Sequence, residues 1–135
     1  YAKENIMLEV GIKGQRETVV TKEKTATGIG SGLLEVFATP IMIALMEESA
    51  FMSVNEILDE GFTTVGIAVD IKHIEATPVG MKVVAKSELI KIDGRELTFN
   101  VEAYDEKGLI GEGVHKRFIV NNDKFQAKTD SKLEK

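Results

Sequence analysis

A single stretch of this sequence is suited to a long helix, and the residues around it alternate as β-strands do. The helical stretch opens at Thr39, which can cap a helix, followed by Pro40, which fits a first helical turn. An unbroken apolar run follows, and Gly61 can take the left-handed conformation that ends helices after about Leu58. One helix among many strands calls for a helix packed on an antiparallel sheet.

The strand candidates are short stretches rich in β-branched residues or alternating between apolar and polar side chains. They are residues 16–26, 63–75, 81–92, 95–104 and 109–120. Asp93 and Gly94, between the third and the fourth, are a common signal for a tight hairpin. The order predicts an α+β architecture, with a five-stranded antiparallel sheet and one long helix in a single domain over residues 1–135. The charged tail from Asn121 is expected to fray.

Composition excludes several classes of function. A net charge of -5 argues against a nucleic-acid partner, which would need clustered lysine and arginine. No apolar run is long enough to span a bilayer, so no membrane partner is expected. With no cysteine there is no disulfide, no thiolate nucleophile and no cysteine metal site. Residues 1–10 lack the basic start and apolar core of a signal peptide, which favours a cytoplasmic location.

Glu47 stands out in the helical stretch. At about 100° per residue, the side chains nearest to it around a helix are all apolar; they are Ile43, Ala44, Ala50, Phe51, Val54 and Leu58. The polar residues Ser49, Ser53 and Glu56 fall on the opposite side. We therefore expect Glu47 to point with the core, where a carboxylate must pair with a cation, accept hydrogen bonds or take up a proton.

Thr39 and His73 are the polar groups that patterning sends toward the same region. His73 is the last residue on an apolar strand face that begins at Val65. Each group also has a simpler explanation: Thr39 as a helix cap, His73 as a solvated strand end, and Glu47 at a subunit interface. Together they suggest acid, base and hydrogen-bond chemistry without a metal, since two histidines and scattered carboxylates form no zinc-binding spacing.

The last strand presents a second, weaker constellation. His115 and Arg117 share one face with Gly111 and Gly113, which leave room for a close approach to the backbone. This face could line a ligand channel or meet a partner subunit. No glycine-rich phosphate loop follows a strand and opens a helix elsewhere in the chain.

Three motifs of this chain occur in an order and spacing that identify a family. They are EVFATPIMIALMEESA, GIAVDIKHIEATPVGMKV and GEGVHKRFIVNNDKFQAK. Together they resemble the fluoroacetyl-CoA thioesterase-like family, a branch of the hot dog fold, over residues 35–128. The resemblance implies a sheet wrapped around the central helix, a homodimer, and acyl-CoA sites at the interface between the two subunits.

The resemblance also implies site residues. Hydrolysis of the thioester would use Thr39, Glu47 and His73 as catalytic residues. A backbone N–H at Gly66 would polarise the thioester carbonyl, and Arg117 matches an arginine of the family's last strand. Leu33 and Phe37 complete the implied substrate contacts. CoA is then part of the substrate, and neither a separate cofactor nor a metal is expected.

One difference from the family bears on specificity. Ahead of EVFAT this chain has Leu33 and Leu34, where the fluoroacetyl-specific enzyme carries phenylalanine, so a short or medium acyl group is expected rather than fluoroacetyl alone. Attack by Glu47 itself and attack by a water molecule that Glu47 activates remain open. A hot dog dehydratase is disfavoured because no GHFP-like segment leads to the histidine. An acyl-CoA binding or sensing domain and a dimerisation module are the non-catalytic alternatives.

Overall fold

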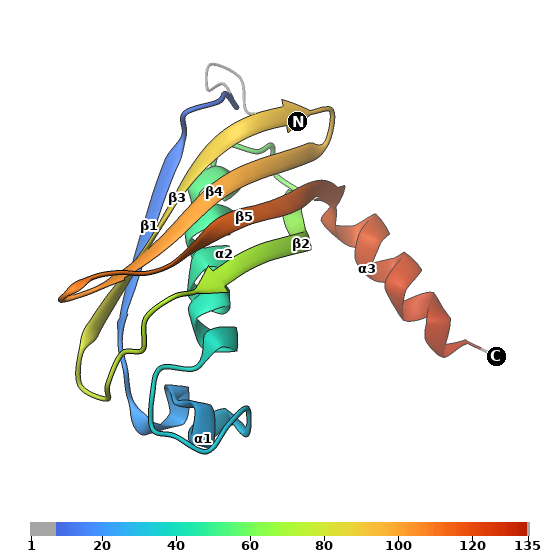
Figure 1. Cartoon of the computed structure of the whole chain (residues 1–135). Helices are drawn as coiled ribbons and strands as arrows, with labels where there is room; N and C mark the ends of the chain where they lie inside the picture. Colours follow the sequence, from blue (N-terminus) through green and yellow to red (C-terminus); the bar gives the residue numbers. More distant parts are fainter. Residues whose placement is uncertain (1–7, 135) are drawn as a thin grey trace.

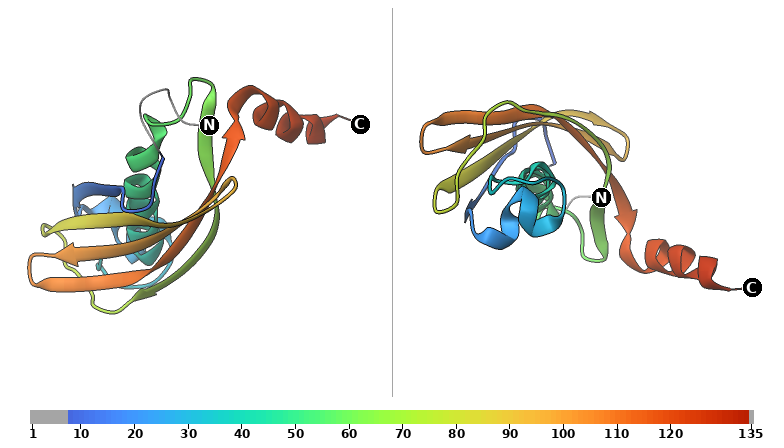
Figure 2. Two further views of the ribbon diagram at one scale, coloured as in Figure 1. Left: turned by 90° about the horizontal axis from the view of Figure 1, so that it is seen from above. Right: turned by 60° about the horizontal axis from the view of Figure 1, so that its bottom comes forward.

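In the computed structural model, which describes residues 8–134, a five-stranded antiparallel sheet curves around one long helix, as Figures 1 and 2 show. The strand order is β1-β3-β4-β5-β2, so β1 and β2 are the edges. The bounds are β1 Lys13–Val19, α1 Ala26–Ile29, α2 Thr39–Asn55, β2 Phe62–His73, β3 Lys82–Asp93, β4 Glu96–Asp105, β5 Gly108–Asn121 and α3 Asn122–Asp130. Short 3-10 turns lie at Lys22–Lys24 and Ser131–Leu133. The predicted α+β class is confirmed.

The hairpin predicted at Asp93 joins β3 to β4. Asp93 pairs with Glu96, and Gly94 begins the two-residue turn with a φ of 61°. In the pair formed by β2 and β5 the register shifts between Gly66 and Ala68, so that Ile67 is an extra residue, a β-bulge. This bulge lies opposite the middle of α2 and shapes the candidate site described below.

Two segments differ from the sequence-based expectation. The first strand ends at Val19, and the following residues turn through the short helix α1, which ends at Gly30 with a φ of 77°. The tail that was expected to fray forms α3, where the Asn121 side chain accepts a hydrogen bond from the backbone N–H of Lys124 at 3.0 Å. Figure 1 shows α3 projecting away from the sheet. Among the described residues, no helix is both long and apolar enough to cross a bilayer.

Helix α2 buries a face that differs from the one predicted. The side chains turned into the core are Met42, Leu45, Met46, Ser49, Ala50 and Val54. Ser49 is fully buried and donates from Oγ to Ser87 Oγ on β3 at 2.9 Å. A Cβ on Gly14 of β1 would lie 2.4 Å from the Ser49 carbonyl oxygen. The side of α2 that carries Ser49 therefore faces β1 and β3 rather than water, and the helix lies so close to these strands that only small residues fit between them.

Gly111 and Gly113 of β5 allow a close approach to the strand backbone, as predicted from the sequence. A Cβ at Gly111 would lie 2.6 Å from the sulfur of Met42 on α2. One at Gly113 would lie 2.1 Å from the carbonyl oxygen of Asp70 on β2. Both positions are glycine because a helix side chain and a neighbouring strand approach the backbone more closely than any side chain would allow.

Candidate active site

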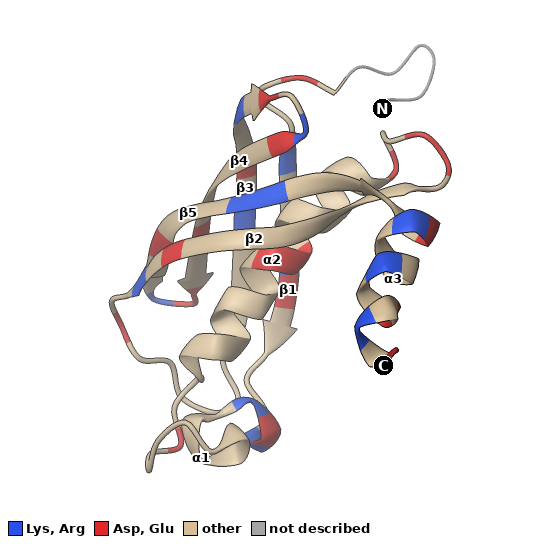
Figure 3. Ribbon diagram, turned by 90° about the vertical axis from the view of Figure 1, so that its right-hand side faces the viewer, with Lys and Arg blue, Asp and Glu red and all other residues tan. Residues whose placement is uncertain are grey.

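Glu47 lies at the edge of the buried face of α2, beside β2 and β5. Helix α2 has no charged residue other than Glu47 and Glu48, and Figure 3 shows this acidic band next to β2. The Glu47 side chain is 40% exposed, so the prediction that it points into the core is wrong for the single chain. The prediction failed because the core stripe runs through Met42, Met46 and Ser49 and leaves Glu47 on its flank. It nevertheless finds the cation that a partly buried carboxylate needs.

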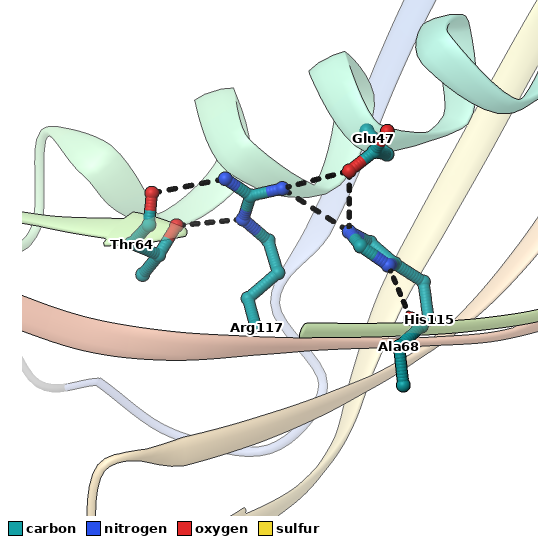
Figure 4. Close-up of polar contacts among 5 residues, drawn as sticks. All are labelled: Glu47, Thr64, Ala68, His115 and Arg117. Carbon is teal, nitrogen blue, oxygen red and sulfur yellow. Dashed lines mark hydrogen bonds and ion pairs between the residues drawn. The ribbon is translucent and has the colours of Figure 1, made fainter. Parts of the chain in front are cut away.

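That cation is Arg117 of β5, whose guanidinium is held from several sides (Figure 4). Nη1 lies 3.6 Å from Oε2 of Glu47, while Nε donates to Thr64 Oγ1 at 2.7 Å and Nη2 to the Thr64 carbonyl at 2.9 Å. Burial lowers the pKa of Arg117, and the charge of Glu47 opposes that effect. A buried guanidinium fixed by directional bonds stabilises the carboxylate anion at one position.

His115 completes this cluster, and it was not among the predicted site residues. Its ring is 1% exposed, and Nδ1–H donates to the Ala68 carbonyl at 2.9 Å. Nε2 therefore carries the lone pair and accepts from Arg117 Nη1 at 3.1 Å. Burial lowers the pKa of His115, and the charge of Arg117 lowers it further, against the opposing effects of the Ala68 carbonyl and Glu47. The only signal in the sequence was that His115 shares a strand face with Arg117 and two glycines.

Gly66 lies directly against the Glu47 carboxylate. A Cβ at this position would be 2.6 Å from Glu47 Oε2 and 3.3 Å from Cε1 of His115. No side chain fits there without displacing the carboxylate. The structure thus brings together three residues that the sequence had proposed for the site, Gly66, Glu47 and Arg117.

Thr39 and His73 form a second, separate cluster. Thr39 Oγ1 and His73 Nδ1 are 2.7 Å apart, and Nε2 of His73 is buried without a hydrogen-bond partner among residues 8–134. Burial lowers the pKa of His73, and the backbone of Glu75 opposes that effect. The side chain of Thr39 does not cap α2, because Ala38 occupies the cap position and Thr39 is the first helical residue. Its hydroxyl is engaged with the histidine instead.

A cavity of about 280 Å³ opens beside this pair. Phe37 and Ile74 help to line it. Phe37 is nevertheless only 1% exposed and belongs to the hydrophobic core, so little of its ring is free for a ligand. Leu33 lies on the loop before α2 and is 93% exposed, so its side chain is directed mainly to solvent in the single chain.

The two clusters do not meet within one chain. Thr39 and Glu47 are eight residues apart on α2, a rise of about 12 Å along the helix axis. No hydrogen bond or ion pair in the described part of the chain links Glu47 to Thr39 or His73. Residues 8–134 also contain no group of three histidine, aspartate or glutamate side chains arranged to hold a metal. The structure therefore contains a hydrogen-bonded threonine–histidine pair and, separately, a carboxylate held by an arginine.

Comparison with known proteins identifies the family. The profile of the fluoroacetyl-CoA-specific thioesterases matches residues 20–123. The fluoroacetyl-CoA thioesterase of Streptantibioticus cattleyicolor is 38% identical over 98 residues, which cover 73% of this chain and 70% of that protein. A solved structure of the fluoroacetyl-CoA thioesterase FlK superposes with a TM-score of 0.88 at 32% identity, covering 93% of this chain and 98% of the other.

More distant structures agree on the fold. A thioesterase superfamily member from Thermus thermophilus is 30% identical, with a TM-score of 0.86 over 95% of both chains. A hot-dog-like protein from Thermanaerovibrio acidaminovorans reaches a TM-score of 0.85 at 21% identity over 93% of both chains, which supports the fold alone. The hot dog fold implied by the sequence motifs is confirmed. Because the profile spans most of its length, this chain belongs to the family of fluoroacetyl-CoA-specific thioesterases.

Proposed function

We propose that this protein hydrolyses a short or medium acyl-CoA thioester to the free acid and CoA. One observation carries the proposal beyond family membership. The Glu47 carboxylate is partly exposed, yet it is held by the buried Arg117 and faces a glycine backbone rather than a side chain. An acyl group can reach this carboxylate from solvent, which a purely structural ion pair would not require.

The proposed enzyme is a homodimer whose sites draw on both subunits. Thr39, to which His73 is hydrogen-bonded, is about 12 Å along α2 from Glu47, so one chain does not place them around a single thioester. Within residues 8–134, strand β2 is an edge of the sheet and pairs on one side only, and its side chains Ile67 and Val69 are each 48% exposed. Pairing of two such edges would bring the Glu47 of one subunit toward the Thr39 and His73 of the other.

In the proposed mechanism Glu47 either attacks the thioester carbonyl carbon or removes a proton from an attacking water. The carbonyl oxygen becomes negative and is stabilised by the backbone N–H at Gly66. When the carbon–sulfur bond breaks, His73, whose orientation is fixed by Thr39, donates a hydrogen bond to the departing thiolate, which takes up a proton released by the water that the reaction consumes. Direct attack forms a mixed anhydride on Glu47, which water then hydrolyses. Water is the only co-reactant, so no cofactor enters the reaction.

The acyl specificity is proposed from the loop before α2. Leu33 and Leu34 are 93% and 68% exposed, and the loop around them contains Gly30 and Gly32. Leucine side chains on a glycine-containing loop can close over an aliphatic chain, and they contribute about 25 cal/mol for each Å² of apolar surface removed from water. Short and medium aliphatic acyl groups are therefore expected to be better substrates than fluoroacetyl. The cytoplasm, as favoured by the sequence, is the proposed location.

Release of free thiol from a panel of acyl-CoAs tests the proposal. The panel runs from acetyl and fluoroacetyl to medium-chain and phenylacetyl groups, and the protein itself contributes no thiol because it contains no cysteine. E47Q and H73A are expected to lose at least nine-tenths of turnover, since each removes one chemical step. E48Q is the matched control, because Glu48 pairs with Arg16 on the other side of α2 and should leave turnover unchanged.

Three outcomes are informative. Turnover that is lost in E47Q and H73A but kept in E48Q supports hydrolysis at the proposed site. Turnover that survives in E47Q removes Glu47 from the chemistry. Binding of acyl-CoA without turnover across the whole panel would instead indicate an acyl-CoA sensing domain.

A further inference from the structure

Two side chains of β5 form hydrogen bonds with β2, one on each side of Gly66. Arg117 donates twice to Thr64, which lies two residues before the glycine. His115 donates to the carbonyl of Ala68, two residues after it. The register shift between β2 and β5 falls between Gly66 and Ala68. The bulge that sets Gly66 against the carboxylate is therefore bracketed by two side chains from the neighbouring strand (Figure 4).

The hydrogen bonds that Arg117 and His115 make to β2 are coupled, because His115 also contacts Arg117. Its Nε2 accepts from Arg117 Nη1 at 3.1 Å and lies 3.7 Å from Oε2 of Glu47. A nitrogen lone pair and a carboxylate oxygen repel each other, and only the guanidinium, in contact with both, makes the arrangement favourable. The cluster thus depends on a neutral imidazole in one tautomer, with its proton on Nδ1.

The position of His115 is fixed by its surroundings. The ring is 1% exposed and lies stacked on Phe99 of β4, with centroids 6.5 Å apart and planes at 29°. The neighbouring Glu47 side chain is 40% exposed whereas His115 is 1% exposed, so a substrate reaches the carboxylate and not the ring. Its influence on a reaction must pass through Arg117, Glu47 and the bulge.

We propose that His115 is a positioning residue of the thioesterase site, holding Arg117 beside Glu47 through Nε2 and the β2 bulge at Gly66 through Nδ1–H. The kinetic consequence rests on the proposed function, whereas the geometric part does not. Loss of either hydrogen bond lets the carboxylate or the glycine backbone shift. Displacement of about 1 Å at a reacting group can cost about 100-fold in rate.

The first experiment needs no substrate. Long-range proton–nitrogen NMR spectra of the ¹⁵N-labelled protein at neutral pH report the tautomer of each histidine, and two histidines give a spectrum that one variant, H73A, assigns. His115 is expected as the neutral ring with its proton on Nδ1. A proton on Nε2, alone or together with one on Nδ1, would overturn the proposal.

The second experiment separates the two hydrogen bonds. In H115Q the amide oxygen can take the place of Nε2 as acceptor for Arg117, in H115N the amide can still donate to Ala68, and H115F retains neither. We expect H115F to lower kcat about 100-fold, because a reacting group displaced by about 1 Å loses rate on that order. KM should change less than threefold, because His115 does not touch the substrate. H115Q and H115N should each recover part of kcat. K116Q, on the opposite face of β5, should match the wild type.

The outcomes distinguish failure of this proposal from failure of the proposed function. Unchanged kcat in H115F, or a loss that appears only in KM, would exclude a positioning role. If the wild type hydrolyses no thioester, the Nε–H resonance of Arg117 decides instead: it should shift in H115F and stay in K116Q. An unshifted resonance in H115F would overturn the proposal. If H115F does not fold, the same comparison is made with H115Q and H115N.

Discussion

Glu47 has room beside β2 only because residue 66 is a glycine. A Cβ there would lie 2.6 Å from the carboxylate oxygen, which is shorter than any ordinary contact between carbon and oxygen. The sequence singled out Glu47 from its place on the helix and Gly66 from family motifs. It placed His115 on one strand face with Arg117 but not beside Gly66, because that proximity depends on the register between β2 and β5, which appears only in the folded sheet.

G66A is therefore expected to lower turnover while leaving the fold intact. The methyl group must push Glu47 away from Arg117, and a shift of about 1 Å would reduce kcat by about 100-fold. Thiol release measures the activity, and circular dichroism checks the fold. K72Q, an exposed change on the same strand, is the control and should behave as the wild type. Wild-type kcat in G66A would show that the carboxylate does not act from this position.

The two histidines should make stability fall in mild acid. Burial lowers the pKa of both His73 and His115 in the folded protein, whereas in the unfolded chain they titrate near pH 6.5. As the pH falls below about 6.5, the unfolded state therefore binds more protons than the folded state, and the free energy of unfolding decreases. Above that pH both histidines are neutral in both states, and the stability is at its full value. Urea titrations at a series of pH values across this range measure the slope. H115Q should flatten it, and an equal slope in H115Q and wild type would contradict the prediction.

At the scale of elements, the strands were predictable and the orientation of the helix was not. Strands have a period of two, so alternation in β4 predicts its buried face directly, with Leu97, Phe99 and Val101 inside. Helix α2 is apolar on nearly every side, and its few serines give a misleading polar side. Ser49 is buried because β1 approaches there, at Gly14, and no pattern within the helix could reveal a contact with a strand 35 residues earlier.

Replacement of the buried serine tests this close packing. S49L adds volume where the Ser49 backbone and Gly14 already touch and removes the hydrogen bond to Ser87. Overpacking of this kind costs about 1–3 kcal/mol of unfolding free energy. Chemical denaturation measures the cost, with E56Q, at the exposed residue that follows α2, as the control. If S49L were as stable as the wild type, β1 would not pack closely against this face.

At the scale of the whole molecule, the residues proposed for the site lie in two separate groups within one chain. Thr39 and His73 are bonded to each other, and Glu47 is bonded to Arg117, with the two groups about two helical turns apart. The sequence predicted all four residues, because patterning and motifs identify residue types. It could not show the distance between them, since that distance depends on how α2, β2 and β5 pack in the folded chain.

A mixture of two inactive variants can show whether the site is shared between subunits. E47Q and H73A should each be inactive as homodimers. In a mixed dimer, the Glu47 kept by one subunit meets the His73 kept by the other, so one of the two sites is intact. Random exchange of equal amounts makes about half the dimers mixed, and about a quarter of wild-type turnover should return. The variants are mixed after mild denaturation and refolding, and thiol release is compared with each variant refolded alone. If both catalytic groups acted within one chain, every site would carry one defect, and mixing would restore no activity.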